Sequence, residues 1–351
     1  MSGGIAQLVA VGAQDAHLVG QPEVSFFRSN YKRHTNFAQT VERQVIQGNP
    51  STGGMSTVRF ERKGDMVGYV YIAPNDGTKA VTFTPSEWVA AISKVELLIG
   101  GQVIDEQTSE FSQYIAPTVL AQNLTKSTSG FAEAAKSKFY PLRFSFCENA
   151  QTAIPLIALQ YHDVELRITW GSDLDGATYE VYSQFIHLDT DERTALSSTP
   201  QNMLITQTQK AIASVSKTQE LNFNHPIKCL VAADGTSLAI AAVANKMKLQ
   251  INGTDVADFK YVDPHYTAVT SYYHTISSKD DEHLAGANEK FFLYPFCLDT
   301  SKVQPTGSLN FSRLDSARLV NDTANSDTDI YAVNYNILRI ENGMGGLMYS
   351  N

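Results

Sequence analysis

The clearest structural signal in this chain is KVELLIGGQVID, at residues 94–105. Two apolar-rich runs flank Gly100-Gly101, and such a pair of glycines favours a tight hairpin because both turn positions can take positive φ. A second signal of this kind lies in the other half of the chain, where residues 246–251 lead into Asn252-Gly253. We therefore predict antiparallel β-hairpins in both halves.

Strand-like alternation extends outward from these hairpins. At residues 164–170 apolar and polar side chains alternate strictly, which is typical of a half-buried strand. Further strands are predicted at residues 66–72 and 331–340. Residues 131–138 favour a short helix, and helical signal is otherwise sparse. The pattern indicates an all-β sandwich class.

The two halves also resemble each other. The first hairpin matches the second 152 positions later, through the pairs Val95 and Met247, Leu97 and Leu249, Ile99 and Ile251, and Gly101 and Gly253. A second set matches at 150 positions: Phe144, Phe146, Cys147, Pro155, Leu159, Tyr161 and Val164 with Tyr294, Phe296, Cys297, Pro305, Leu309, Phe311 and Leu314. We infer two copies of one β-domain, joined in the polar stretch at residues 189–201.

Composition narrows the function classes. The chain has 351 residues, which suits two domains, and a net charge of -9. Because nucleic-acid binding needs a basic face, we expect no direct nucleic-acid partner. The three cysteines lie in or beside apolar runs and are interpreted as reduced core thiols. Apolar stretches are too short for a membrane span and the N-terminus lacks a basic leader, so a soluble, intracellular product is expected.

Catalytic and metal motifs are missing from the sequence. There is no His-Glu-x-x-His, Gly-x-Ser-x-Gly or phosphate-binding glycine loop. The segment Tyr161-His162-Asp163 is interpreted as a local ion pair at a strand start rather than a proton relay, since neighbours on a strand point to opposite faces. We therefore predict no catalytic, cofactor-binding or metal-binding residue and no enzymatic activity.

Residues 1–40 differ from the rest. An apolar segment from Ile5 to Ala13 is followed by the helix-breaking Gly20-Gln21-Pro22 and then by an aromatic and basic run at residues 25–34. One interpretation is an arm with a short helix that packs under the first domain. The other is an arm that reaches a neighbouring subunit.

Several motifs together are similar to one known family. They are residues 7–37, RKGD at 62–65, IGGQVID at 99–105, PLRF at 141–144, AIPLIALQYH at 153–162, FNHP at 223–226, PTGSLNFSR at 305–313 and YNILRI at 335–340. With these motifs the chain resembles the major capsid proteins of nucleocytoplasmic large DNA viruses, over nearly its whole length.

The resemblance implies a double jelly roll: two tandem eight-stranded antiparallel β-sandwiches with few short helices. It places an N-terminal arm at 1–26, a first jelly roll at 27–198 and a second at 199–351. It also implies a homotrimer forming a pseudo-hexagonal capsomer of an icosahedral virion shell, made and assembled in the host cytoplasm. Expected partners are neighbouring capsomers, minor capsid proteins and the internal viral membrane. Family members are usually longer, so short outer loops are expected at 76–87 and 254–263.

Inter-subunit contacts are expected from the aromatic arm and the C-terminal tail. The candidate residues are Phe26, Phe27, Tyr31, Arg33, Phe37, Met344, Leu347 and Tyr349. Gly343 to Gly346 is interpreted as a flexible tail or a tight turn. Two alternatives stay open: a minor capsid paralogue of the same fold, and a two-domain β-sandwich carbohydrate-binding protein, which glycan-array binding would reveal.

Overall fold

The structure is a computed structural model that describes residues 4, 7, 9–75, 81–126, 138–233, 238–241, 244–276, 291–323 and 328–350. The predicted helix at residues 131–138 lies outside this part of the chain, apart from Lys138. Residues 1–36 and residues 37–351 form two separate units.

Residues 1–36 contain one short described helix, α2 (Ala16–Val19). It ends at Gly20, as the helix-breaking Gly20-Gln21-Pro22 predicts. No described side chain between residues 9 and 36 is buried. The first strand begins only at Phe37, so residues 27–36, which we assigned to the first jelly roll, contain no strand.

The first half of the larger unit is a sandwich of two antiparallel sheets. One sheet has the order β1-β10-β4-β7, with β8 also paired to β4, and the other has the order β2-β3-β9-β5-β6. The strands are β1 (Phe37–Gln44), β2 (Ile46–Gln47), β3 (Met55–Arg59), β4 (Met66–Asn75), β5 (Ile92–Ile99), β6 (Gln102–Thr108), β7 (Tyr140–Pro141), β8 (Ile154–Pro155), β9 (Val164–Trp170) and β10 (Thr178–Leu188).

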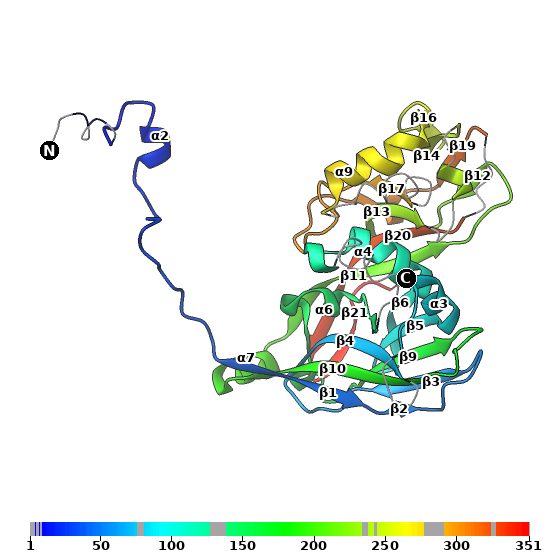
Figure 1. The fold of residues 1–351 in the computed structure, drawn as a ribbon, viewed down its shortest axis with the longest axis horizontal. Coiled ribbons are helices and arrows are strands. Elements are labelled where there is room, and N and C mark those ends of the chain that lie inside the picture. Colours follow the sequence, from blue (N-terminus) through cyan, green and yellow to red (C-terminus); the bar gives the residue numbers. More distant parts are fainter. Residues whose placement is uncertain are drawn as a thin grey trace. The chain divides into compact units, whose positions relative to one another are not determined.

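The second half repeats most of this topology: β11-β20-β13-β17 corresponds to β1-β10-β4-β7, and β19-β14-β15 corresponds to β9-β5-β6. Its sheets have the orders β11-β20-β13-β17, with β18 on β13 and β21 on β20, and β12-β19-β14-β15, with β16 on β14. The strands are β11 (Gln201–Ala211), β12 (Thr218–Glu220), β13 (Pro226–Ala233), β14 (Lys246–Ile251), β15 (Thr254–Asp255), β16 (Lys260–Tyr261), β17 (Phe291–Pro295), β18 (Leu309–Asn310), β19 (Ala317–Asn321), β20 (Ile330–Glu341) and β21 (Met344–Leu347). The predicted double jelly roll is confirmed (Figure 1).

The predicted hairpins and strands are present. Gly100 and Gly101 join β5 to β6 with φ of 58° and 82°, and Asn252 and Gly253 join β14 to β15 with φ of 50° and 78°. Side chains along β9 alternate between buried and half-buried, as the alternation at residues 164–170 predicts.

One part of the predicted repeat is wrong in register. Ile99 pairs with Val164, and its counterpart Ile251 pairs with Ala317 rather than with the predicted Leu314. The hairpins match at the predicted offset, whereas the predicted counterpart of Val164 is displaced by three residues. The segment between the hairpin and this later strand differs in length between the two copies. The apolar alternation of each strand does not show that difference in length.

The described helices are short, and most were not predicted. They are α3 (Pro85–Ala91), η1 (Phe111–Ile115), α4 (Ala116–Val119), η2 (Leu124–Lys126), α6 (Ser145–Glu148), η3 (Ala150–Thr152), η4 (Leu156–Ala158), α7 (Thr190–Ser198), η5 (Ala239–Ala241), α8 (Val262–Pro264), η6 (His265–Val269), α9 (Thr270–His274) and η8 (Phe311–Arg313). The polar stretch between the halves is therefore largely a helix, α7, capped by Asp189. Among the described helices none combines the length and apolar character that crossing a membrane needs.

Three hydrophobic cores hold the larger unit together. One fills the first sandwich, one fills the second, and a third lies between them. The first core also takes in Ile205 of β11 and Leu338 and Ile340 of β20, strands that run alongside both halves (Figure 1). The three cysteines are free and buried, as predicted, and burial raises the pKa of the Cys147 and Cys229 thiols.

Candidate assembly surfaces

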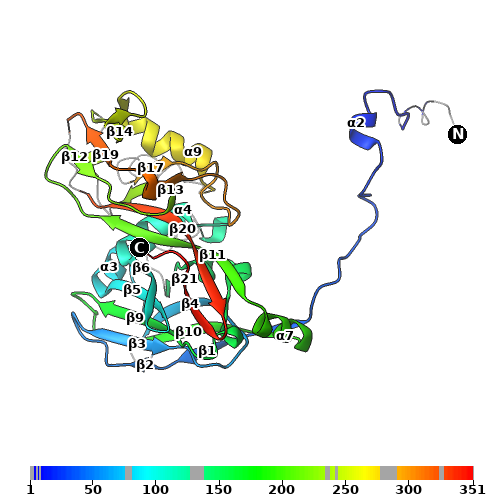
Figure 2. The ribbon, with the colours of Figure 1, turned by 180° about the vertical axis from the view of Figure 1, so that it is seen from behind.

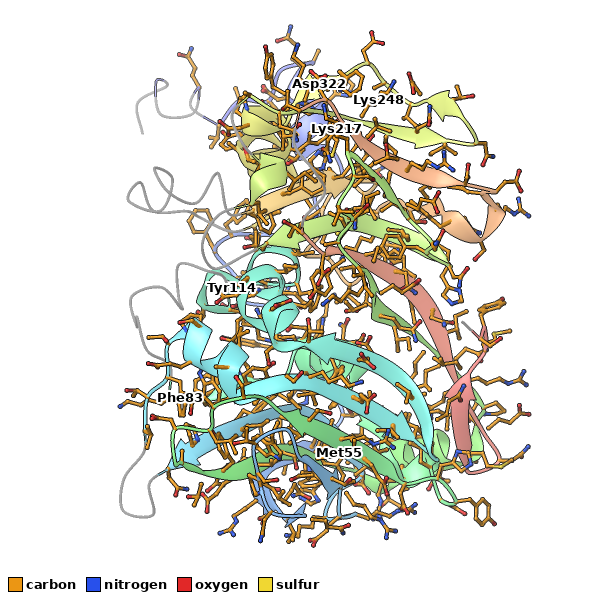
Figure 3. All side chains as sticks on the ribbon, turned by 90° about the vertical axis from the view of Figure 1, so that its right-hand side faces the viewer. Met55, Phe83, Tyr114, Lys217, Lys248 and Asp322 are labelled. Carbon is orange, nitrogen blue, oxygen red and sulfur yellow. The ribbon has the colours of Figure 1, made fainter. Side chains whose placement is uncertain are left out.

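The junction between the two sandwiches is built from a helix and a sheet face. Phe111 and Ile115 of η1, with Val119 of α4, pack against the outward face of β13, β17 and β20. Figure 1 places α4 between the two halves, and Figure 3 shows Tyr114 of η1 at the same boundary. Because these side chains are buried, the two sandwiches share a packed interface and are not independent domains joined by a flexible linker.

A tyrosine hydroxyl reinforces this apolar junction. Tyr331 of β20 donates to Glu110 Oε2 at 3.0 Å, and its oxygen lies 2.8 Å from Thr108 Oγ1. Its ring packs against Phe111, with 5.6 Å between ring centroids. Burial raises the pKa of Tyr331, so this hydroxyl stays protonated and available as a donor.

A buried carboxylate forms a second link. Asp105 of β6 accepts hydrogen bonds from the Thr208 backbone N–H of β11 at 2.8 Å and from Gln107 Nε2 at 3.0 Å. Beside it, Gln207 Nε2 donates to the Ile104 carbonyl. Burial outweighs these donors and raises the pKa of Asp105 to about 7.

The C-terminal tail forms a β-strand that pairs within the same chain. After a turn at Asn342 and Gly343, β21 pairs with β20 (Figure 2). The Tyr161 N–H donates to the Gly343 carbonyl at 2.9 Å. The interpretation as a tight turn is confirmed, whereas the flexible-tail interpretation is wrong. Leu347 is partly buried and packs against the first core.

In the segment Tyr161-His162-Asp163 the aspartate forms an ion pair, as predicted, but with a residue distant in the sequence rather than a local one, and the histidine makes a further contact. Asp163 pairs with Arg59 at 2.5 Å. His162 Nδ1 lies 2.9 Å from the Gly345 carbonyl oxygen and 3.2 Å from its backbone nitrogen. His162 therefore anchors β21 to the first sandwich, a role that local sequence did not indicate.

The remaining predicted contact residues are exposed. Phe26, Phe27, Tyr31 and Arg33 lie in the arm unit, and Phe37 starts the edge strand β1. Met344 and Tyr349 are also exposed, although the Tyr349 carbonyl accepts a hydrogen bond from Asn336 Nδ2 at 3.0 Å.

Two further aromatic surfaces were missed by sequence reasoning. Tyr71 of β4 stacks on Tyr182 of β10 with 5.3 Å between ring centroids, and Phe139 meets Tyr71 edge-on at 5.7 Å. On α9, Tyr272 and Tyr273 are exposed and meet edge-on at 5.0 Å. The alternation at residues 66–72 could have indicated that Tyr69 and Tyr71 face outward from the core.

The described residues near these surfaces do not meet the requirements of a metal site. In the part of the chain that the structure describes, no three His, Cys, Asp or Glu side chains converge in a way that could hold a metal ion.

Two family models cover most of this chain. "Major capsid protein N-terminus" matches residues 25–201, and "Large eukaryotic DNA virus major capsid protein" matches residues 232–346. The chain belongs to the major capsid protein family of large eukaryotic DNA viruses. Like other members of this family, it is a structural component of the virion capsid and not an enzyme.

Relatives and solved structures agree with this family. The major capsid proteins of Pyramimonas orientalis virus and Paramecium bursaria Chlorella virus 1 are 34% and 31% identical, with all of each chain covered. A chain of the PBCV-1 virus capsid is 26% identical with a TM-score of 0.75, covering 93% of this chain and all of the other. The Faustovirus major capsid protein, 10% identical with a TM-score of 0.60, shares the fold. These similarities favour the major capsid role over the two alternatives.

Proposed function

We propose that three copies of this chain form a trimeric capsomer of pseudo-hexagonal outline. The two jelly rolls, placed at residues 27–198 and 199–351, would contribute six similar sandwiches around a three-fold axis. The observation that carries the proposal is the repeated sheet order of two sandwiches locked together by a shared core. Because each chain is a rigid block with two similar halves, a trimer with three-fold symmetry would have an outline close to a hexagon.

In this proposal the capsomers tile an icosahedral shell through many weak lateral contacts. Each contact need bury only a modest area, because a lattice multiplies its effect. Other neighbours are minor capsid proteins and the internal viral membrane, and assembly takes place in the host cytoplasm. The acidic chain, with a net charge of -9, supports a shell without direct nucleic-acid contact.

Mass determination in solution tests the trimer. Light scattering should give three times the chain mass of 38.5 kDa, and electron microscopy should show particles of hexagonal outline. A monomer at every concentration would contradict the proposal. Specific binding on a glycan array would instead favour the carbohydrate-binding alternative.

We further propose that the arm residues Phe26, Phe27, Tyr31, Arg33 and Phe37 contribute to inter-subunit contacts, together with Met344, Leu347 and Tyr349 of the tail. Replacing Phe26 and Phe27 with alanine should weaken the trimer, because two exposed aromatic side chains would lose their buried area on the neighbour. Val215→Ala, at an exposed site in the second sandwich, is the control. Trimers of unchanged stability in the double variant would remove the arm from the interface.

A further inference from the structure

We propose that helix η6–α9 of one chain packs on the outward face of β10, β4 and β7 of the next chain. This contact would repeat between chains the junction that η1–α4 makes within each chain. The inference rests on the proposed trimer and names the surfaces that would close it. It is drawn from the equivalence of the two sandwiches, residue by residue.

The strand register makes the two sheet faces equivalent. In the first sandwich Tyr182 pairs with both Arg43 and Tyr71. In the second sandwich Tyr331 pairs with both Lys210 and Val231. The faces therefore carry Tyr182 and Tyr331 at the same position.

Ion pairs beside the two tyrosines follow the same equivalence. Arg43 pairs with Glu180 at 3.1 Å, and Lys210 pairs with Asp329 at 2.5 Å. Each acid lies two residues before its tyrosine in the sequence: Glu180 lies on β10, and Asp329 immediately precedes β20. The outward face of the first sandwich therefore carries an ion pair equivalent to the one beside Tyr331 at the junction.

The helices are equivalent as well. Each begins with a five-residue π-helix, η1 or η6, that runs directly into a short α-helix, α4 or α9. Each also follows the equivalent hairpin, β5–β6 or β14–β15. Aligning the two π-helices matches Phe111, Ile115 and Val119 with His265, Val269 and Tyr273.

The matched positions differ in one respect, which is burial. Phe111, Ile115 and Val119 are fully buried in the junction, whereas Val269 and Tyr273 are 38% and 72% exposed. Large apolar side chains on one side of a short helix, exposed where their counterparts are covered, indicate a missing neighbour.

The sheet face of the first sandwich shows the same difference. Tyr331 is 2% exposed, whereas Tyr69 and Phe139, on the face that carries Tyr182, are each 43% exposed. The Tyr182 hydroxyl donates to Glu180 of its own strand at 2.9 Å, while Tyr331 reaches Glu110 of the other sandwich. The occupant that fits is a helix like η1–α4, and η6–α9 of a second copy is that helix.

Such a contact is head-to-tail, because the helix and the face lie on different halves of each chain. A heterologous contact that repeats the internal step closes into a ring only if the number of steps completes a turn. In a ring of three chains, three junctions within chains would alternate with three contacts of the same kind between chains. The geometry thus supports a closed trimer rather than a symmetric dimer.

Site-directed crosslinking tests the contact. The probe pair is His265→Cys with Tyr182→Cys, because the equivalent Phe111 and Tyr331 rings lie 5.6 Å apart. A short bismaleimide should join chains into covalent dimers and trimers, and the buried native thiols should contribute little background. Thr254→Cys with Tyr182→Cys is the control, since Thr254 lies in the β14–β15 hairpin on the other sheet.

A second variant checks the same face without crosslinking. Tyr273→Glu should weaken the trimer at least tenfold, while Val215→Glu should leave it unchanged. Trimers that form without crosslinking at the probe pair and tolerate Tyr273→Glu would overturn the inference and leave the proposed trimer standing. Monomers of the unmodified chain at all concentrations would overturn both.

Discussion

The hydroxyl oxygen of Tyr331 lies 2.8 Å from Thr108 Oγ1, although 223 positions separate the two residues in the chain. Tyr331 belongs to β20 of the second sandwich, and Thr108 ends β6 of the first. This hydrogen bond lies at the edge of the third hydrophobic core, where Phe111 packs on the same tyrosine ring. Polar and apolar contacts together make the two jelly rolls a single block.

Removing this hydroxyl should loosen the junction without creating a cavity. Tyr331→Phe keeps the ring against Phe111 but deletes the hydrogen bonds to Thr108 and Glu110. We expect the free energy of unfolding to fall by about 1–2 kcal/mol. Tyr161→Phe, at an exposed tyrosine, should change it by less than about 0.5 kcal/mol. Equal effects in denaturant titrations of the two variants would argue against a structural role for the Tyr331 hydroxyl.

Asp105 should make stability depend on pH. Its pKa in the folded chain is about 7, above the ordinary value of 3.8, so the folded state holds this proton more tightly than the unfolded state. The contribution of Asp105 is therefore fully favourable below about pH 4 and is lost as pH rises toward 7.

Asp105→Asn isolates this contribution, since it cannot ionise. Between pH 4 and pH 7 the melting temperature of the variant should fall less, or rise more, than that of the unmodified chain. Melting curves across this range provide the measurement, and parallel pH profiles would show that Asp105 titrates normally.

The two glycines of the first hairpin should respond differently to alanine. Both have positive φ, but a Cβ on Gly100 would lie 2.4 Å from His162 Nδ1, whereas Gly101 faces open space. Gly101→Ala should cost about 1 kcal/mol through backbone strain alone. Gly100→Ala should cost about 1–3 kcal/mol more, because the His162 ring must move. Thermal unfolding of both variants compares them, and an equal loss would contradict the close packing.

The tail strand offers another matched pair. A Cβ on Gly345 would lie 2.7 Å from Leu159 Cδ2 and 3.2 Å from Ile99 Cγ2, both in the first core. Gly345→Ala should destabilise the chain by about 1–2 kcal/mol through overpacking. Gly346→Ala meets only the flexible Gln102 side chain, at 3.1 Å, and should stay within about 0.5 kcal/mol. If both variants unfold like the unmodified chain, β21 is not docked in this way.

The short helices show where sequence reasoning stopped. Helix α3 carries a readable start, because Thr84 and Glu87 form a capping box and Pro85 occupies the first helical position. Helix η1–α4 carries a weaker start, because Thr108 Oγ1 accepts a hydrogen bond from the Phe111 backbone N–H at 3.4 Å but Phe111 stands where a capping box needs Glu or Gln. Its side chains are mostly buried from two directions, so they show no clear amphipathic period. Its existence depends on the sheet face that covers it.

The sequence by itself determined the β class, the two hairpins and their repetition, because alternation and turn residues act over a few neighbouring positions. Only the tertiary structure decided which of the repeated surfaces is covered. Tyr182 and Tyr331 occupy equivalent strand positions, yet one is half-buried and the other is enclosed. Burial at such positions depends on an element far away in the chain, and local sequence carries no record of that neighbour.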